Sequence, residues 1–252
     1  MICGLILDIS RSRDFSVDRS VLGRALAVYP LMAAKTSHYI GRTYLVTDSP
    51  AVKALALQYQ TIIVDPHEAP AGSPIAETAI GKAYPLILED LKRDGETLEF
   101  AAIMFTHVPT VTSELIDIGV DTLREFTDAD SAVSVSKYNH FNPYAALRET
   151  IDRRFEPYLP PAAEAKHDVW YPDWGVAIVR PKNIEDLSKG PSPYPWIGRR
   201  VAGLKQWGGG PIDAPWQIAH AEHWLKQHGV PDLSPTMERQ PKLQPAPKAD
   251  RR

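Results

Sequence analysis

The sequence has little of what marks several specialised classes of protein. It contains one cysteine, Cys3, so no disulfide can form within the chain, and a buried structural thiol is expected. No apolar run approaches the roughly 18 residues of a membrane-spanning helix, and the N-terminal run meets Asp8 too early for a signal peptide. A net charge of −3 provides no basic field for nucleic acid. These absences favour a protein of the reducing cytoplasm that binds neither nucleic acid nor a membrane.

The sequence does contain alternating strand and helix patterns, which are typical of an α/β domain. Hydrophobic residues make up 44% of the chain and charged residues 23%, which is ordinary for a globular protein. Short apolar runs predict strands at residues 2–9, 42–47, 61–64, 100–105 and 131–136. Helical spacing predicts helices at residues 22–34, 51–59, 75–92 and 114–126. This order predicts a doubly wound sheet with helices on both faces.

The second half of the chain departs from this rhythm. Residues 137–168 are rich in aromatics, prolines and mixed charge, and are too long for an ordinary connection. We interpret them as an excursion that packs on another subunit, which predicts a homodimer. Residues 169–179 then return to the sheet, and their late return predicts an antiparallel strand in a mixed sheet. Residues 231–252 are proline-rich and poor in apolar residues, so we expect a disordered tail after a single domain of residues 1–230.

The polar loop after the first strand is a candidate phosphate site. A loop between a strand and a helix is where α/β proteins bind phosphate. Here it reads SRSRDFSVDRS and offers Arg11 and Arg13, but no glycine lies between Gly4 and Gly23 to form a backbone cradle. The arginines could clamp phosphates or could be ordinary surface residues.

The stretch KQWGGGPIDAPWQIAHAEHWL, from Lys205 to Leu225, is the most distinctive part of the sequence. Three consecutive glycines favour a backbone that passes close to a ligand or takes positive φ. Asp213 is a candidate N-cap for a helix with Pro215 in its first turn and one apolar face formed by Trp216, Ala219 and Trp224. The carboxylate could be only a cap, or it could also face a phosphate or a metal.

Several motifs, in order, resemble the cytidylyltransferases that make CMP-activated acid sugars, of the acylneuraminate and ketodeoxyoctulosonate type. VTDSPAVKALALQYQ is similar to that family's strand, Thr-Asp and helix, and FTHVPTVTSELIDIGVDTL falls where the family has its QPTSPLRT loop and helix. DADSAVSVSKYNHFNPYAAL resembles the family's ADSVVSV strand leading into an excursion. DWGVAIVRP and PIDAPWQIAHAE resemble the NGAIYIF strand and the closing DIDTELDFKIAE, while KQWGG is similar to a motif of a less common branch. The resemblance covers about residues 43–229.

The resemblance implies a three-layer, Rossmann-like nucleotide-diphospho-sugar transferase fold that transfers CMP from CTP to an anionic acceptor and releases pyrophosphate. In this interpretation Arg11, Arg13 and Asp213 are catalytic. Nucleotide contacts come from Arg11, Ser12, Arg13, Ser73 and His107. Acceptor contacts come from Asn139, Trp174, Lys205 and Trp207. A Mg²⁺ ion is held by Asp213 and His107.

This chain also departs from the family pattern. Its first loop lacks the family's glycines and lysine, and Phe105 stands where the family has its glutamine. Pro211 and Gln217 replace two of the closing aspartates, and His107 replaces a metal-binding aspartate although Mg²⁺ prefers oxygen ligands. Lys205 could be a solvated lysine and Trp207 a core residue. The alternative is therefore a non-catalytic member that binds a nucleotide or a partner protein through the same fold.

Overall fold

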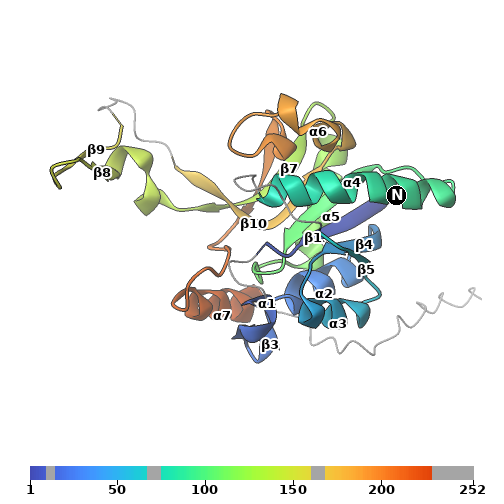
Figure 1. Cartoon of the computed structure of the whole chain (residues 1–252). Helices are drawn as coiled ribbons and strands as arrows, with labels where there is room; N and C mark the ends of the chain where they lie inside the picture. The colour runs from blue at the N-terminus through green and yellow to red at the C-terminus, as the bar shows by residue number, and fades with distance from the viewer. Residues whose placement is uncertain (10–14, 67–74, 160–167, 229–252) are drawn as a thin grey trace, which may run out of the picture.

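The computed structural model describes residues 1–9, 15–66, 75–159 and 168–228. Its centre is a seven-stranded sheet of strand order β11-β7-β10-β6-β1-β4-β5, with helices on both faces (Figure 1). The strands are β1 (Ile2–Leu7), β4 (Ile40–Val46), β5 (Ile62–Val64), β6 (Phe100–Phe105), β7 (Ser131–Lys137), β10 (Trp170–Val179) and β11 (Val201–Gln206). The predicted α/β architecture is confirmed.

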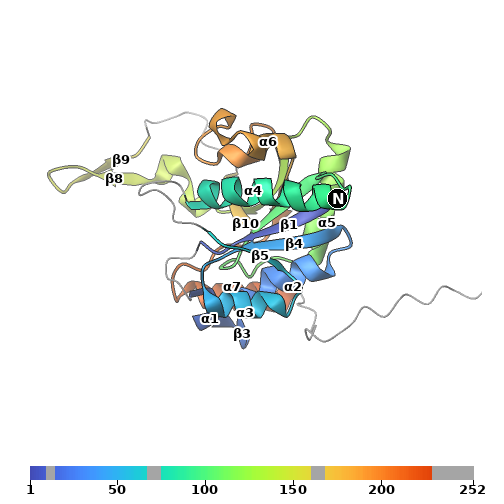
Figure 2. The same cartoon turned by 45° about the vertical axis from the view of Figure 1, so that its right-hand side comes forward.

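The two faces of the sheet carry separate cores. On one face, α4 (Ile75–Arg93) and α6 (Pro181–Glu185) cover β1 and β6, and Trp196 is buried with them. The opposite face packs against the other α-helices, most of which lie below the sheet in Figure 2. These are α1 (Phe15–Asp18), α2 (Val28–Thr36), α3 (Pro50–Leu57), α5 (Ser113–Glu125) and α7 (Gln217–His228). The central strands β1 and β6 are buried throughout because both of their faces are covered.

The sheet is mixed, as the late return of the chain predicts. β10 pairs antiparallel with both β6 and β7, whereas β1, β4, β5 and β6 pair in parallel and β11 is parallel to β7. Its register shifts between Pro172 and Ala177, so β10 bulges beside the carboxyl ends of its neighbours. That bulge places Trp174 at the edge where α/β sheets bind ligands.

Two local predictions were wrong, and one strand was missed. The helix expected at residues 22–34 begins only at Val28, because β2 (Ser20–Val21) and β3 (Arg24–Ala25) form a small hairpin before it. β11 was not predicted, because as an edge strand it lacks a continuous apolar run. Ser113, directly before the helix expected at residues 114–126, is the N-cap that the sequence suggests, but the cap of α5 is Thr112, whose side chain accepts from the amide of Leu115.

The excursion projects from the body as an arm (Figures 1 and 2). It contains two short 3₁₀ helices, η1 (Asn139–Phe141) and η2 (Pro143–Ala145), and a hairpin of β8 (Leu147–Glu149) and β9 (Phe155–Pro157). Two further 3₁₀ helices, η3 (Leu187–Lys189) and η4 (Pro195–Ile197), follow α6. Among the described residues, no helix combines the length and hydropathy needed to cross a membrane. The predicted tail at residues 231–252 lies outside the described residues.

Candidate functional site

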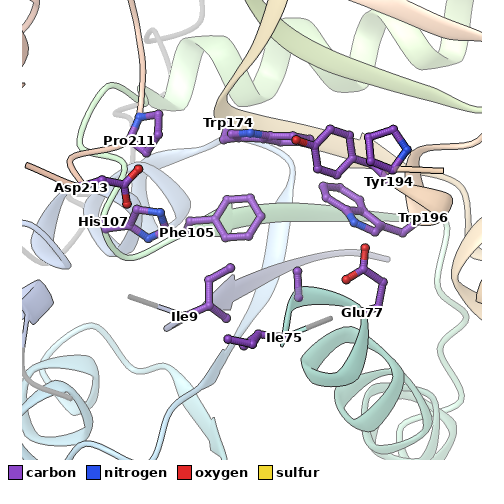
Figure 3. Close-up of a pocket in the computed structure, with 12 residues that line it drawn as sticks. Ile9, Ile75, Glu77, Phe105, His107, Trp174, Tyr194, Trp196, Pro211 and Asp213 are labelled. Carbon is purple, nitrogen blue, oxygen red and sulfur yellow. The ribbon is translucent and has the colours of Figure 1, made fainter. Parts of the chain in front are cut away.

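A pocket of about 450 Å³ opens at the carboxyl ends of β1 and β6 (Figure 3). The first turn of α4, the β10 bulge, the segment that includes η4 and the loop before α7 enclose it. Its aromatic lining residues are Phe105, Trp174, Tyr194 and Trp196. Its titratable lining residues are Glu77, His107 and Asp213. None of the lining residues that the structure describes is a lysine or an arginine.

The aromatic rings form one wall: Trp174 meets Tyr194 and Phe105 edge to face and lies tilted against Trp196. The Trp174 ring centroid lies 4.6 Å from that of Tyr194, 5.4 Å from that of Trp196 and 5.9 Å from that of Phe105. Trp174 has a φ of 62°, which is strained for a bulky residue. Gly175 follows, and a Cβ there would lie 2.7 Å from the Thr110 carbonyl oxygen. The bulge and this glycine together aim Trp174 into the pocket.

His107 and Asp213 form the polar end of the pocket. The Ile212 amide donates to the His107 carbonyl at 2.9 Å, which fixes the loop before α7 against the end of β6. The His107 Nδ1 atom is buried and has no hydrogen-bond partner among the described residues. Burial lowers the pKa of His107, against the raising effect of Asp213 and Asp8, so the imidazole is neutral at neutral pH. Figure 3 shows the Asp213 carboxylate beside this ring.

A carboxylate that the sequence analysis did not assign, Asp8, directly precedes the pocket residue Ile9. Asp8 follows β1 and accepts from the hydroxyls of Thr47 and Thr106, each at 2.7 Å, and of Ser16 at 3.0 Å. It therefore joins the carboxyl ends of β1, β4 and β6. The signal available in the sequence was an aspartate directly after a buried strand.

The three glycines pack against protein groups. Gly208 has a φ of 72°, as the glycine run suggests. The Gly209 amide donates to Ser136 Oγ at 3.0 Å, and the Gly210 amide to Thr110 Oγ1 at 2.9 Å. A Cβ on Gly209 would lie 3.1 Å from Thr110 Oγ1. The glycines allow the loop that leads to Asp213 to approach the sheet closely.

A buried carboxylate supports the same loop from inside. Asp173 is 1% exposed and accepts from Ser134 Oγ at 2.5 Å, Ser136 Oγ at 2.6 Å and Gln206 Nε2 at 3.1 Å. Burial raises the pKa of Asp173, and these hydrogen bonds, with one from the Gly175 amide, oppose that rise. Because Asp173 joins β10 to β7 and β11, it fixes the strand from which Trp174 projects.

The structure brings together three of the residues proposed from the sequence: Asp213, His107 and Trp174 line one pocket. The cap proposed for Asp213 is wrong. α7 begins at Gln217, whose Oε1 accepts from the amides of Asp213 at 2.7 Å and Ala214 at 2.6 Å. The Asp213 residue itself is exposed. The expected apolar helix face is also revised, because Trp216 is 73% exposed and only Trp224 of the pair is buried.

The remaining proposed residues do not line this pocket or lie outside the described chain. Lys205 is exposed, with Nζ 5.0 Å from the ring centroid of Trp170, and Trp207 is 75% exposed and so is not a core residue. Asn139 holds the base of the arm, donating to Asp168 and accepting from the Val169 amide. The residues outside the description are Arg11, Ser12, Arg13 and Ser73.

Sequence reasoning missed Glu77, Tyr194 and Trp196. Glu77 lies in the first turn of a helix, where an acidic residue is unremarkable. The two aromatics lie in a proline-rich connection, where only their clustering near Pro193 was a signal. Within the described residues, no group of three or more histidine, cysteine or acidic side chains is arranged to hold a metal ion.

No protein-family model matches the sequence, and no curated protein matches it. The fold resembles that of CMP:2-keto-3-deoxy-manno-octonic acid synthetase complexed with CTP, at 12% identity and a TM-score of 0.58, over 90% of this chain and 98% of the other. It also resembles 4-diphosphocytidyl-2C-methyl-D-erythritol synthase from Anaerococcus prevotii, at 14% identity and a TM-score of 0.59, over 89% of this chain and 96% of the other. Both are cytidylyltransferases, so the predicted resemblance is confirmed, and at these identities the likeness establishes the fold.

Proposed function

We propose that this chain is a nucleotidyltransferase that transfers CMP from CTP to an acidic sugar or a related anionic acceptor. The observation that carries the proposal is the pocket at the carboxyl ends of β1 and β6, in a fold shared with a synthetase that binds CTP. Asp213 and His107 stand at the polar end of this pocket and Trp174 at its aromatic wall. In α/β sheets this edge is the usual ligand site.

In the proposed reaction an acceptor oxygen attacks the α-phosphorus of CTP. A new oxygen–phosphorus bond forms, the bond to the bridging oxygen breaks, and pyrophosphate leaves. The protein must neutralise the charge that develops on the phosphates. We assign this role to Arg11 and Arg13, whose guanidinium groups can hold phosphate oxygens bidentately.

The residues present fit Mg²⁺ through Asp213 alone. Magnesium keeps several waters and binds one or two carboxylates together with substrate phosphates, so a single carboxylate at the pocket suits it. The buried Nδ1 of His107 is a nitrogen donor, which Mg²⁺ does not favour. When bound, the ion would share the neutralisation of phosphate charge, and one carboxylate in place of two predicts a high magnesium requirement.

We place the acceptor beside the pocket, at the part of the same sheet edge that is formed by β11. The described pocket lining is acidic and aromatic, so an anionic acceptor would be repelled by Glu77 and Asp213 within it. Lys205 and Trp207, on and after β11, offer an exposed cation and an exposed ring that could hold a carboxylate and the body of a sugar. We therefore propose that the acceptor approaches from the β11 side.

Calorimetry and product analysis on the full chain test this function. We expect CTP to bind in the presence of Mg²⁺, and pyrophosphate to be released when a suitable acid sugar is added. The second candidate, a non-catalytic nucleotide-binding protein, is favoured by the first loop without glycine or lysine. CTP binding without pyrophosphate release across a broad set of acid sugars would support that candidate and contradict catalysis.

We also propose that the arm forms a homodimer with a second copy of the chain. Its exposed apolar side chains are Phe141, Tyr144, Leu147, Ile151, Phe155 and Tyr158. Exposed apolar side chains gathered on a projecting arm are unfavourable in water unless another surface covers them. Sedimentation of the full chain at micromolar concentration should give a dimer mass that Ile151→Asp reduces, and a monomer mass for the unaltered chain would contradict the proposal.

A further inference from the structure

Two complementary groups without partners face the same part of the pocket. Trp196 is 1% exposed, and its Nε1 atom is buried without a hydrogen-bond partner among the described residues. Glu77, in the first turn of α4, makes no hydrogen bond or ion pair with the rest of the described chain. Figure 3 shows the indole nitrogen on the side of the Trp196 ring that faces the Glu77 carboxylate. A buried donor without a partner is rare in proteins and calls for an explanation.

The chemistry of these groups defines the ligand. The rings of Trp174 and Phe105 favour a flat, unsaturated group that can stack or pack edge-on. Trp196 can only donate a hydrogen bond, and an ionised Glu77 can only accept one. The ligand must therefore present an acceptor next to a donor on one edge of a planar ring. A quaternary ammonium group would leave the indole N–H unsatisfied, and a carboxylate would be repelled by Glu77.

An aminopyrimidine edge has this arrangement. We propose that Glu77 and Trp196 read the base of the nucleotide, with Glu77 accepting from the exocyclic amine of cytosine and Trp196 Nε1 donating to ring nitrogen N3. This assignment rests on the proposed function, because it takes the nucleotide to be CTP. Uracil presents a carbonyl and an N–H in these two places, so both pairs would become repulsive. One bidentate pair of this kind typically discriminates between bases by about tenfold to a hundredfold.

The test is a set of dissociation constants measured by calorimetry on the full chain with Mg²⁺, using CTP, UTP and ATP. We expect CTP to bind at least about tenfold more tightly than UTP. A CTP analogue without the exocyclic amine and a 3-deaza analogue, which carries CH in place of N3, should each bind more weakly than CTP. These analogues test the two hydrogen bonds without changing the protein.

Glu77→Gln tests the specificity from the protein side. The amide can donate to the uracil carbonyl, so the variant should reduce the preference for CTP over UTP about tenfold or reverse it. Glu89→Gln is the matched control, because Glu89 lies on the same helix but is exposed and paired with Arg93. The control should keep the preference of the unaltered chain.

Failure of this inference can be separated from failure of the proposed function. Equal affinity for CTP and UTP, tighter binding of ATP than of CTP, or an unchanged preference in Glu77→Gln would each overturn the base assignment, even if pyrophosphate is released. A preference for CTP that Glu77→Gln abolishes would support the assignment, even if no pyrophosphate is released. If the chain binds no nucleotide, both the base assignment and the proposed function fail.

Discussion

The carboxylate of Asp130 holds together the segment that carries the aromatic wall. It accepts from Lys182 Nζ at 2.8 Å and from the amides of Arg199 and Arg200, each at 3.0 Å. These contacts fix the turn between η4, where Trp196 lies, and β11. Burial alone would raise the pKa of Asp130, but the Lys182 hydrogen bond and the two amides lower it to about 2.

The change Asp130→Asn removes the charge that these three donors share. The difference between the ordinary pKa of 3.8 and a value of about 2 corresponds to roughly 2 kcal/mol of stability at neutral pH. Because the folded pKa is lowered, this contribution is present above pH 3.8 and is lost as the pH falls towards 2. We expect urea unfolding at pH 7 to show about 2 kcal/mol of destabilisation in Asp130→Asn, and the difference from the unaltered chain to shrink at pH 3.

The control for this experiment is Asp128→Asn. Asp128 is two residues away, but its side chain is 74% exposed and its pair with Arg200 spans 3.8 Å. Exposed pairs of this kind contribute about 0–1 kcal/mol, so the control should change stability little. A stabilising role of the Asp130 charge is contradicted if the two variants unfold alike, or if the effect of Asp130→Asn is the same at pH 3 and pH 7.

Three further predictions concern the pocket and its loop. Asp213→Asn should keep the fold, because the side chain does not cap α7. It should lower the rate of pyrophosphate release from CTP by at least about tenfold. An activity equal to that of Asp128→Asn would contradict the catalytic role proposed for Asp213. Since burial lowers the pKa of His107, the unfolded chain binds a proton first as the pH falls below 6.5, and the free energy of unfolding should decrease. Relative to His107→Gln, the free energy of unfolding should decrease more steeply between pH 7.5 and 5.5, and equal slopes would contradict this expectation. Gly209→Ala should destabilise by about 1–3 kcal/mol, because its Cβ would lie 3.1 Å from a buried hydroxyl. Gly81→Ala, whose nearest neighbour is 3.9 Å away in a helix, should stabilise by about 0.5–1 kcal/mol in the same urea assay, and equal effects would refute the packing argument.

The parts of the fold that could be predicted are those in which burial determines the sequence pattern. β6 has the bounds that were predicted, because a strand buried on both faces is a continuous apolar run. β10 was predicted as antiparallel from its place in the chain, and it is. β11 was missed because it lies at the sheet edge and alternates exposed and buried residues with a glycine. The start of α7 was misplaced, because the helix begins at Gln217, whose side chain accepts from the amides of Asp213 and Ala214.

The site was predictable only where a motif marked it. Asp213, His107 and Trp174 lie in stretches that resemble known motifs, and all three reach the pocket. In the sequence, Glu77 is an acidic residue at the start of a helix and Trp196 is an aromatic residue in a loop, and neither position suggests a function. They become candidate site residues only because the fold brings α4 and η4 to the same pocket. Such tertiary juxtapositions leave no local pattern in the chain.

The buried polar cluster and the strained residue beside it are parts of one arrangement. The positive φ of Trp174 is a conformation of the kind that costs about 1–3 kcal/mol and persists only where the surroundings fix it. Asp173, one residue before, is held by Ser134, Ser136 and Gln206 from two neighbouring strands, and the Gly175 amide, one residue after, donates to the same carboxylate at 3.2 Å. The backbone on both sides of Trp174 is thus anchored to a single buried group. Burying an aspartate in the sheet core costs free energy. Here the hydrogen bonds of Asp173 offset the strain of the Trp174 conformation, which directs the indole ring out of the sheet and into the pocket.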